Sequence, residues 1–135
     1  MRISATDWMD GGWTVEDSVA LARMVKPLGI DLIDCSSRGT SPVAQIKVGP
    51  GFQVPFAEAV RRDAEIATGA VGLITNPAQA DEIIKTGQAD IVLLAREFLR
   101  DPYWPIHAAM ALGVEPNVPS QYVRAYLDAK GRGSR

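Results

Sequence analysis

The sequence contains one cysteine and one histidine, Cys35 and His107, among its 135 residues. A single cysteine excludes a network of disulfide bonds within the chain and is typical of a protein from a reducing compartment. Thiol and imidazole ligands are therefore scarce, and no spacing of them with carboxylates resembles a set of metal ligands. The sequence indicates no metal site.

Long apolar runs and clusters of one charge are also absent. No run approaches the roughly 20 apolar residues of a membrane-spanning helix, and residues 1–7 lack the apolar segment of a secretory signal. The net charge is −2, and no stretch of the chain is strongly basic. We therefore expect a cytoplasmic protein that binds neither a membrane nor nucleic acid.

What the sequence does contain is a regular alternation of short apolar and longer amphipathic segments, with 47% apolar residues overall. The apolar segments predict four strands, at residues 2–5, 30–35, 70–74 and 90–94. The amphipathic segments predict four longer helices: one that opens at Thr14 and is closed by Gly29, and three at residues 56–64, 77–86 and 103–112. Thr14 with Asp17, and Asn76 with Pro77, are residue pairs that begin helices. This alternation predicts an α/β fold with a parallel sheet.

The first strand is not followed by Gly-x-Gly-x-x-Gly, which disfavours a dinucleotide-binding domain and favours a (β/α) barrel. Four strand–helix units make half of an eight-stranded barrel, in which ligands bind at the carboxyl ends of the strands. We assign the half barrel to residues 1–113 and a tail with a short helix to residues 114–135. The segment 36–55 is rich in Gly, Pro and Ser and is a candidate functional loop.

The segment 90–104 carries the clearest candidate site. It begins as a buried strand, and Ala95 and Arg96 follow at the strand's carboxyl end, before a short helical turn. Asp101 and Pro102 then have the residue types of an N-cap and a first helical position. A small residue, an arginine and a helix N-terminus together suit a phosphate group, because the anion can reach backbone N–H groups and a guanidinium. The alternative is that Arg96 is a solvated charge at the rim of a strand–helix junction.

Six segments carry a further signal: 2–8 (RISATDW), 31–37 (DLIDCSS), 49–58 (GPGFQVPFAE), 67–75 (ATGAVGLIT), 90–104 and 121–126 (QYVRAY). In this order they resemble the Old Yellow Enzyme family, and within it a bacterial group of NADPH dehydrogenases and NADH:flavin oxidoreductases. The resemblance implies that the chain is the C-terminal half, strands five to eight, of a (β/α)8 TIM barrel that holds FMN at its carboxyl-end mouth. It also implies an ene-reductase type of activity, in which NAD(P)H reduces the flavin and the flavin passes hydride to an activated alkene.

The resemblance assigns cofactor-binding roles to Arg2, Gly72, Ala95 and Arg96. Arg2 matches an arginine at the N1/C2=O edge of the flavin, where a cation stabilises negative charge on the reduced ring. The alternative is a barrel-interior arginine paired with a carboxylate. Gly72 matches a glycine that lets the backbone approach the FMN phosphate, and Arg96 matches the arginine that binds it. Position 95 is usually glycine in this family, so the methyl of Ala95 fits if φ is negative and crowds the phosphate if the site needs a positive φ.

Three further residues have implied or possible roles. Ser36 and Ser37 follow the second strand near the expected phosphate, either as part of the site or as hydroxyls that cap the loop. Arg124 matches an arginine that reaches the active site of the neighbouring subunit, which implies a dimer contact; the alternative is an exposed helical arginine. The implied partners are a small-molecule substrate and either a second copy of the chain or the missing N-terminal half.

The residues that bind the substrate and donate the proton in this family precede its strand five, so we assign no catalytic residue here. Cys35 lies within a strand without an apparent His or Asp partner, and His107 lies on a helix among apolar residues, so neither replaces them. Half a barrel would also have unpaired edge strands. Two other interpretations stay open: a non-catalytic phosphate-binding or assembly module, and a truncated gene product without activity of its own.

Overall fold

The computed structural model describes residues 1–37, 42 and 44–126, and it has the predicted α/β fold with a parallel sheet. Four strands pair in the order β1-β2-β3-β4: β1 (Arg2–Ser4), β2 (Leu32–Ser36), β3 (Ala67–Val71) and β4 (Ile91–Leu93). The expected loop 36–55 and tail 114–135 are described only in part, because residues 38–41, 43 and 127–135 lie outside the described residues.

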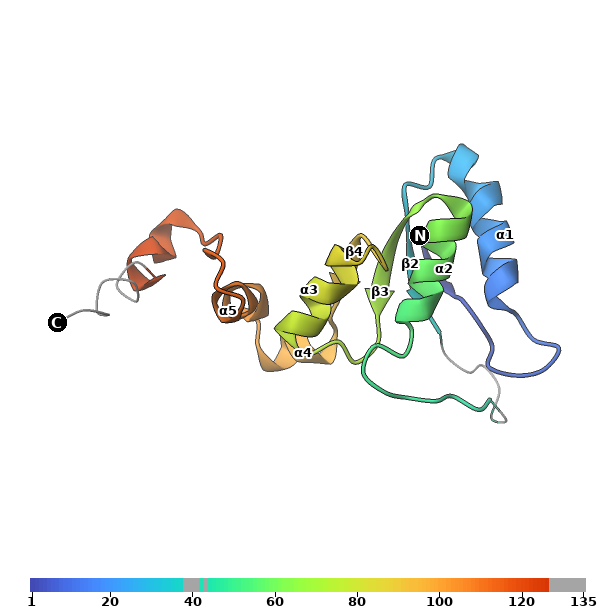
Figure 1. Ribbon diagram of the computed structural model, residues 1–135, viewed down its shortest axis with the longest axis horizontal. Helices are drawn as coiled ribbons and strands as arrows, with labels where there is room; N and C mark the ends of the chain where they lie inside the picture. The colour runs from blue at the N-terminus through green and yellow to red at the C-terminus, as the bar shows by residue number, and fades with distance from the viewer. Residues whose placement is uncertain (38–41, 43, 127–135) are drawn as a thin grey trace.

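Helices connect the strands and follow the last one. They are α1 (Val15–Val25), η1 (Lys26–Leu28), α2 (Val54–Ala64), α3 (Pro77–Lys85), α4 (Arg96–Arg100), α5 (Trp104–Ala111) and η2 (Ser120–Tyr122). Figure 1 shows α1 and α2 side by side against the sheet, while α5 and the segment after it extend away from it. Since each strand pairs with the one before it, right-handed connections place the helices between strands on the same face of the sheet.

The two predicted helix starts are confirmed. The Thr14 hydroxyl accepts a hydrogen bond from the backbone N–H of Asp17, and the Asp17 carboxylate accepts one from the backbone N–H of Thr14, so the capping box of α1 is complete. The side chain of Asn76 accepts hydrogen bonds from Ala78 and Gln79 at the start of α3. Both helices therefore begin where the sequence fixes a side-chain cap.

The third strand lies three residues earlier than predicted, at Ala67–Val71 instead of 70–74. Gly72 and Leu73 have φ of 124° and 51°, values that end a strand. The prediction was drawn towards the apolar Leu73 and Ile74, whereas the strand begins with small residues that pair with β2. From Gly69 on, β3 also pairs with β4. The first helix, predicted to be closed by Gly29, ends as an α-helix at Val25 and continues as the 3-10 helix η1, which Gly29 does close. The remaining predicted elements agree with the structure within two residues at each end.

The start of α5 also differs from the prediction, because Asp101 and Pro102 are not its N-cap and first residue. The N-cap is Tyr103, and Pro105 lies in the first turn. Asp101 is extended, with φ −136° and ψ 91°, and its carboxylate accepts a hydrogen bond from the Tyr103 N–H at 3.0 Å. The aspartate therefore closes the turn between α4 and α5 instead of capping the helix.

The helix α5 lies beside α3. Trp104 is buried, and its indole N–H donates to the carbonyl oxygen of Thr75 at 3.1 Å, just before α3 begins. This hydrogen bond fixes the start of α5 next to the start of α3. Among the described residues, no helix is long and apolar enough to cross a bilayer.

The two faces of the sheet differ in what covers them. On one face, Ile33, Cys35 and Ala70 are fully buried in the core with side chains of α1 and α2. The opposite face alternates with it along each strand and stays partly exposed. At the centre of that face Gly69 has no side chain, and a Cβ placed there would lie only 2.6 Å from Cδ1 of Leu93 on the neighbouring strand. Leu93 therefore leans over the bare backbone of β3.

Candidate cofactor site

A cleft with a volume of ≈ 510 Å³ lies at the carboxyl ends of the strands. Residues that follow β2, β3 and β4 line it, together with Arg2 of β1. All four residues predicted to bind the cofactor line this one cleft: Arg2, Gly72, Ala95 and Arg96. The topology explains this for Gly72, Ala95 and Arg96, since parallel strands all end at the same end of a sheet. Arg2 begins β1 and contributes its side chain to the cleft.

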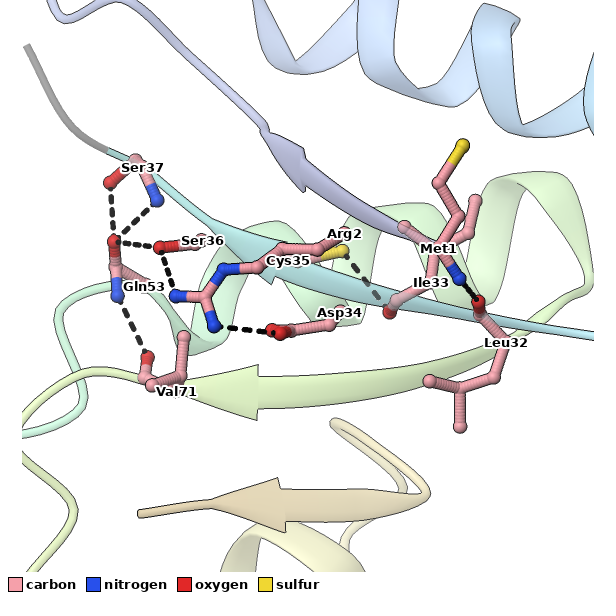
Figure 2. A network of polar contacts seen from close by, with 10 residues as sticks. All are labelled: Met1, Arg2, Leu32, Ile33, Asp34, Cys35, Ser36, Ser37, Gln53 and Val71. Carbon is pink, nitrogen blue, oxygen red and sulfur yellow. Dashed lines mark hydrogen bonds and ion pairs between the residues drawn. The ribbon is translucent and has the colours of Figure 1, made fainter. Parts of the chain in front are cut away.

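Arg2 is held by two neighbours on β2. Its guanidinium forms an ion pair with the Asp34 carboxylate at 3.0 Å and donates a hydrogen bond to the Ser36 hydroxyl at 3.1 Å. Arg2 pairs in register with Asp34, so the two side chains lie on the same face of the sheet (Figure 2). The expected alternative, an arginine paired with a carboxylate, is therefore observed. The side chain is nevertheless 60% exposed, so the guanidinium remains accessible from the cleft.

Gln53 is a residue of the cleft that the sequence analysis missed. It is 4% exposed and lies just before α2, but its side chain turns towards the strands and makes no bond to the helix. Its carbonyl oxygen accepts hydrogen bonds from the backbone N–H and the hydroxyl of Ser37 and from the hydroxyl of Ser36. Its NH₂ group donates to the carbonyl oxygen of Val71 at 3.2 Å. The amide therefore joins the end of β2 to the end of β3, as Figure 2 shows.

One signal in the sequence could have identified Gln53. It is an uncharged polar residue between Phe52 and Val54, at a helix start where Ser, Thr, Asp or Asn is the usual cap. A glutamine at such a position that does not cap the helix must satisfy its amide elsewhere.

The turn after β3 has a strained backbone that faces the cleft. Gly72 is buried, and a Cβ at its φ of 124° would lie 2.9 Å from the amide nitrogen of Gln53 and 3.0 Å from the ring of Phe52. Its carbonyl oxygen accepts a hydrogen bond from the Gly51 N–H at 2.8 Å. Leu73 follows with a positive φ, which is unfavourable for a residue with a side chain. Only glycine fits position 72, and the turn therefore exposes backbone to the cleft.

The turn after β4 supplies Ala95 and Arg96. Ala95 has a φ of −100°, outside the left-handed region that strains residues with a Cβ. A negative φ was the condition under which alanine was expected to fit at this position. Within the described part of the chain, the guanidinium of Arg96 makes no hydrogen bond or ion pair, whereas Arg100 on the same helix is paired with Glu97. Arg96 is thus an exposed cation with free donors at the edge of the cleft.

Arg124 lies elsewhere. It is exposed, and residues 123–126 around it are helical and follow η2 in the segment that extends away from the sheet (Figure 1). It is not among the described residues that line the cleft. The structure therefore separates Arg124 from the other predicted site residues within one copy of the chain.

Neither Cys35 nor His107 has the surroundings of a catalytic group. Burial raises the pKa of the Cys35 thiol to about 12, with a smaller contribution from the Asp34 carboxylate, so the thiol stays protonated at neutral pH. His107 is exposed, and its Nδ1 lies 2.7 Å from the Asp101 carboxylate, outside the cleft. The polar side chains that line the cleft belong instead to arginine, serine, threonine, glutamine and one glutamate, Glu97.

Comparisons with known proteins give one consistent result. A model of the NADH:flavin oxidoreductase / NADH oxidase family matches residues 1–115. The chain is 54% identical over 127 residues to an NADPH dehydrogenase of Halalkalibacterium halodurans, and 55% identical over 126 residues to an NADPH dehydrogenase of Geobacillus sp.. These matches cover 94% and 93% of this chain but only 37% of each relative. The chain thus spans little more than a third of the length of the relatives.

Proposed function

Because the chain belongs to the NADH:flavin oxidoreductase / NADH oxidase family, we propose that it forms the FMN-binding part of an NAD(P)H-dependent flavin oxidoreductase of the ene-reductase type. The observation that carries this proposal is the cleft at the carboxyl ends of the strands, which collects Gly72 and Arg96 from the ends of β3 and β4 and the side chain of Arg2 from β1. A single anionic ligand of extended shape can contact all three.

The residues present fit the phosphate end of FMN. Gly72 lines the cleft, and only a residue without a Cβ fits there, because Gln53 and Phe52 occupy that position. In this proposal the backbone of the turn, with no side chain at Gly72, faces the anion. Arg96 offers donors that no described residue uses, and an arginine binds a phosphate through two parallel hydrogen bonds. In this proposal Gly72 and Arg96 hold the phosphate, and the methyl of Ala95 is accommodated at its negative φ.

Arg2 fits the other end of the cofactor. Asp34 and Ser36 orient its guanidinium, which then needs little rearrangement to face the N1/C2=O edge of the ring. A fixed cation at that edge stabilises negative charge on the reduced ring. When FMN is bound it supplies the hydride transfer from NAD(P)H to an activated alkene, and the protein's part here is to bind, orient and stabilise.

We further propose that β1 to β4 are strands five to eight of a (β/α)8 barrel. The strand order supports this, because each strand lies beside its predecessor without the reversal found in doubly wound sheets. The partly exposed face of the sheet would then line the barrel interior. Another half barrel or a second copy of the chain would complete the enclosure, and Arg124 would reach a neighbouring subunit.

The first test is a titration of FMN by flavin fluorescence quenching with the wild-type chain, Arg96→Ala and the control Arg62→Ala. Arg62 lies on α2, is paired with Asp63 and is not part of the cleft. Loss of a charge-assisted pair costs about 1.5–3 kcal/mol, so Arg96→Ala should weaken FMN binding by about 10- to 100-fold while Arg62→Ala leaves it unchanged. Riboflavin, which lacks the phosphate, should bind the wild type and Arg96→Ala alike.

Two results would contradict the proposal. Absence of quenching by the wild-type chain would mean that these residues alone do not hold FMN. Equal binding of FMN and simple phosphomonoesters, with no effect of Arg2→Ala, would instead indicate the non-catalytic phosphate-binding module. If FMN binds as expected, oxidation of NAD(P)H is then measured with and without the N-terminal part of a relative.

A further inference from the structure

The amide of Gln53 has an orientation that its partners fix without ambiguity. One partner, the Ser37 N–H, can only donate, and another, the Val71 carbonyl, can only accept. The oxygen must therefore point to the end of β2 and the nitrogen to the end of β3. Since the side chain is almost completely buried, these bonds exclude water and hold the two strand ends at a fixed separation.

The same amide touches both ends of the cleft. On one side, its nitrogen contacts the carbonyl of Val71, the residue before Gly72, and lies where a Cβ of Gly72 would be. On the other side, its oxygen accepts from the Ser36 hydroxyl at 3.4 Å, and that hydroxyl accepts from the Arg2 guanidinium at 3.1 Å. A continuous chain of hydrogen bonds thus runs from Arg2 through Ser36 and Gln53 to the turn at Gly72 (Figure 2).

We propose that Gln53 is a positioning residue that holds Gly72 and Arg2 at a fixed distance from each other, so that the phosphate end and the ring end of FMN are recognised as one unit. This inference rests on the proposed function. Gln53 acts through its neighbours and not by contact with reacting atoms. Its length and its two-sided amide are both required, because a carboxylate cannot donate to the Val71 carbonyl and an asparagine is one methylene shorter.

A purely structural role makes a different prediction from a positioning role. If Gln53 only stabilised the fold, its loss would lower the folded fraction and weaken FMN and riboflavin equally. If it positions Gly72 relative to Arg2, its loss should reduce the preference for FMN over riboflavin, because only FMN presents a phosphate to the turn at Gly72. The ratio of the two dissociation constants therefore separates the two roles.

The experiment compares wild type, Gln53→Met, Gln53→Glu and the control Gln88→Met. Gln88→Met is the same substitution at a position far from the cleft. Gln88 lies in the connection between α3 and β4, at the amino ends of the strands. Affinities for FMN and riboflavin are measured by fluorescence quenching, and the exchange of the Ser37 amide proton is measured without ligand. In Gln53→Met we expect the FMN preference to fall by about 10-fold and the Ser37 amide to exchange about 10-fold faster, while Gln88→Met matches the wild type in both.

Gln53→Glu retains an acceptor for Ser37 but loses the donor for Val71. It should keep the Ser37 amide protected and still lose FMN preference, and it carries the test if Gln53→Met does not fold. An unchanged affinity ratio in both variants would overturn the inference while the proposed function stands. Failure of the wild-type chain to bind FMN would overturn the proposed function and this inference together.

Discussion

The two ends of the sheet satisfy their polar groups in different ways. At the amino ends of the strands, the Asp90 carboxylate accepts two hydrogen bonds from the Arg61 guanidinium, at 3.0 and 3.1 Å, and one from the Thr68 N–H at 2.8 Å. At the carboxyl ends, Arg96 has no partner among the described residues and Leu73 has a positive φ. At the amino end the charged groups are paired, although the buried Thr68 hydroxyl has no hydrogen-bond partner among the described residues. The carboxyl end keeps free donors and a strained residue that a ligand can use.

Further contacts at the amino end support this contrast. The Arg23 guanidinium donates to the carbonyl oxygen of Asp63, and Lys26 donates to the carbonyl oxygens of Ala64 and Glu65. These carbonyls belong to the end of α2, where helix carbonyls lack partners within the helix. Cations from the α1 side therefore complete a helix terminus at this end of the sheet. The two ends thus differ in their cations: those at the amino end have partners within the chain, and Arg96 at the carboxyl end has none among the described residues.

Among the variants that test this difference between the two ends, we expect Gly72→Ala at the carboxyl end to have the largest effect on stability and on FMN binding. The new Cβ would meet Gln53 and Phe52 at a φ of 124°, so we expect a loss of about 2–3 kcal/mol in unfolding free energy together with the loss of FMN binding. Urea unfolding and FMN titration measure the two effects. The control is Gly29→Ala, which has φ 96° but no atom within 4 Å of the new Cβ, and it should cost about 1 kcal/mol and leave FMN binding unchanged. Equal costs at the two positions would show that the contacts at Gly72 contribute nothing.

The next effect concerns Asp90 at the amino end. Asp90→Ala leaves the Thr68 N–H and the Arg61 guanidinium without their acceptor, so the unfolding free energy should fall by about 2 kcal/mol. The FMN affinity of the folded protein should not change, because Asp90 is outside the cleft. Asp90→Asn keeps an oxygen for Thr68 and should lose less. A weaker FMN affinity in either variant would contradict the separation of the two ends.

The same carboxylate makes stability depend on acid. The hydrogen bonds from Arg61, more than that from Thr68, lower the pKa of Asp90 below its ordinary value of 3.8. Its contribution to stability is therefore complete above pH 3.8 and disappears as the pH falls through the lower pKa of the folded state. The unfolding free energy of the wild type should therefore approach that of Asp90→Asn as the pH falls below 3.8. If the unfolding free energies of the two proteins differ by the same amount at every pH, Asp90 does not contribute in this way.

We expect the smallest effect on stability from Cys35. It lies between Asp34 and Ser36 in the sequence, but its side chain points to the buried face of the sheet. Its pKa of about 12 in the folded chain exceeds the ordinary value of 9.0. Below pH 9 the thiol adds no pH dependence, and as the pH rises the unfolded chain loses the proton first, so stability falls. Relative to Cys35→Ala, the wild type should lose about 1.4 kcal/mol of unfolding free energy at pH 10 compared with pH 8. A constant difference between the two proteins would show that the thiol titrates normally.

Sequence patterns predicted most reliably those features that depend on neighbouring residues. The caps at Thr14 and Asn76 are confirmed because one side chain and the next turn of the helix decide them. Asp101 and Pro102 have the same local signature, but the side chain closes a turn to Tyr103 and the helix begins later. A capping sequence therefore predicts that the chain turns at that residue. Whether a helix begins there depends on tertiary packing.

The site was predictable only as far as its residues carry a recognisable type. Ala95 and Arg96 at a strand end, before a helical turn, suggested a phosphate, and only the family resemblance added Arg2 and Gly72. The structure brings all four to one cleft. The role of Gln53 depends on partners 16 and 18 residues away along the chain, at the ends of two different strands. A pattern of neighbouring residues cannot show which distant parts of the chain lie next to Gln53 in the folded protein.

The bare backbone at Gly69 has a consequence for the topography of the open face of the sheet. Leu93 and Ile91 of β4 occupy the space that a side chain at position 69 would take. Any element that packs on this face at Gly69 therefore contacts side chains of β4. The relief of that surface is thus set by one missing side chain and by the neighbour that fills its place.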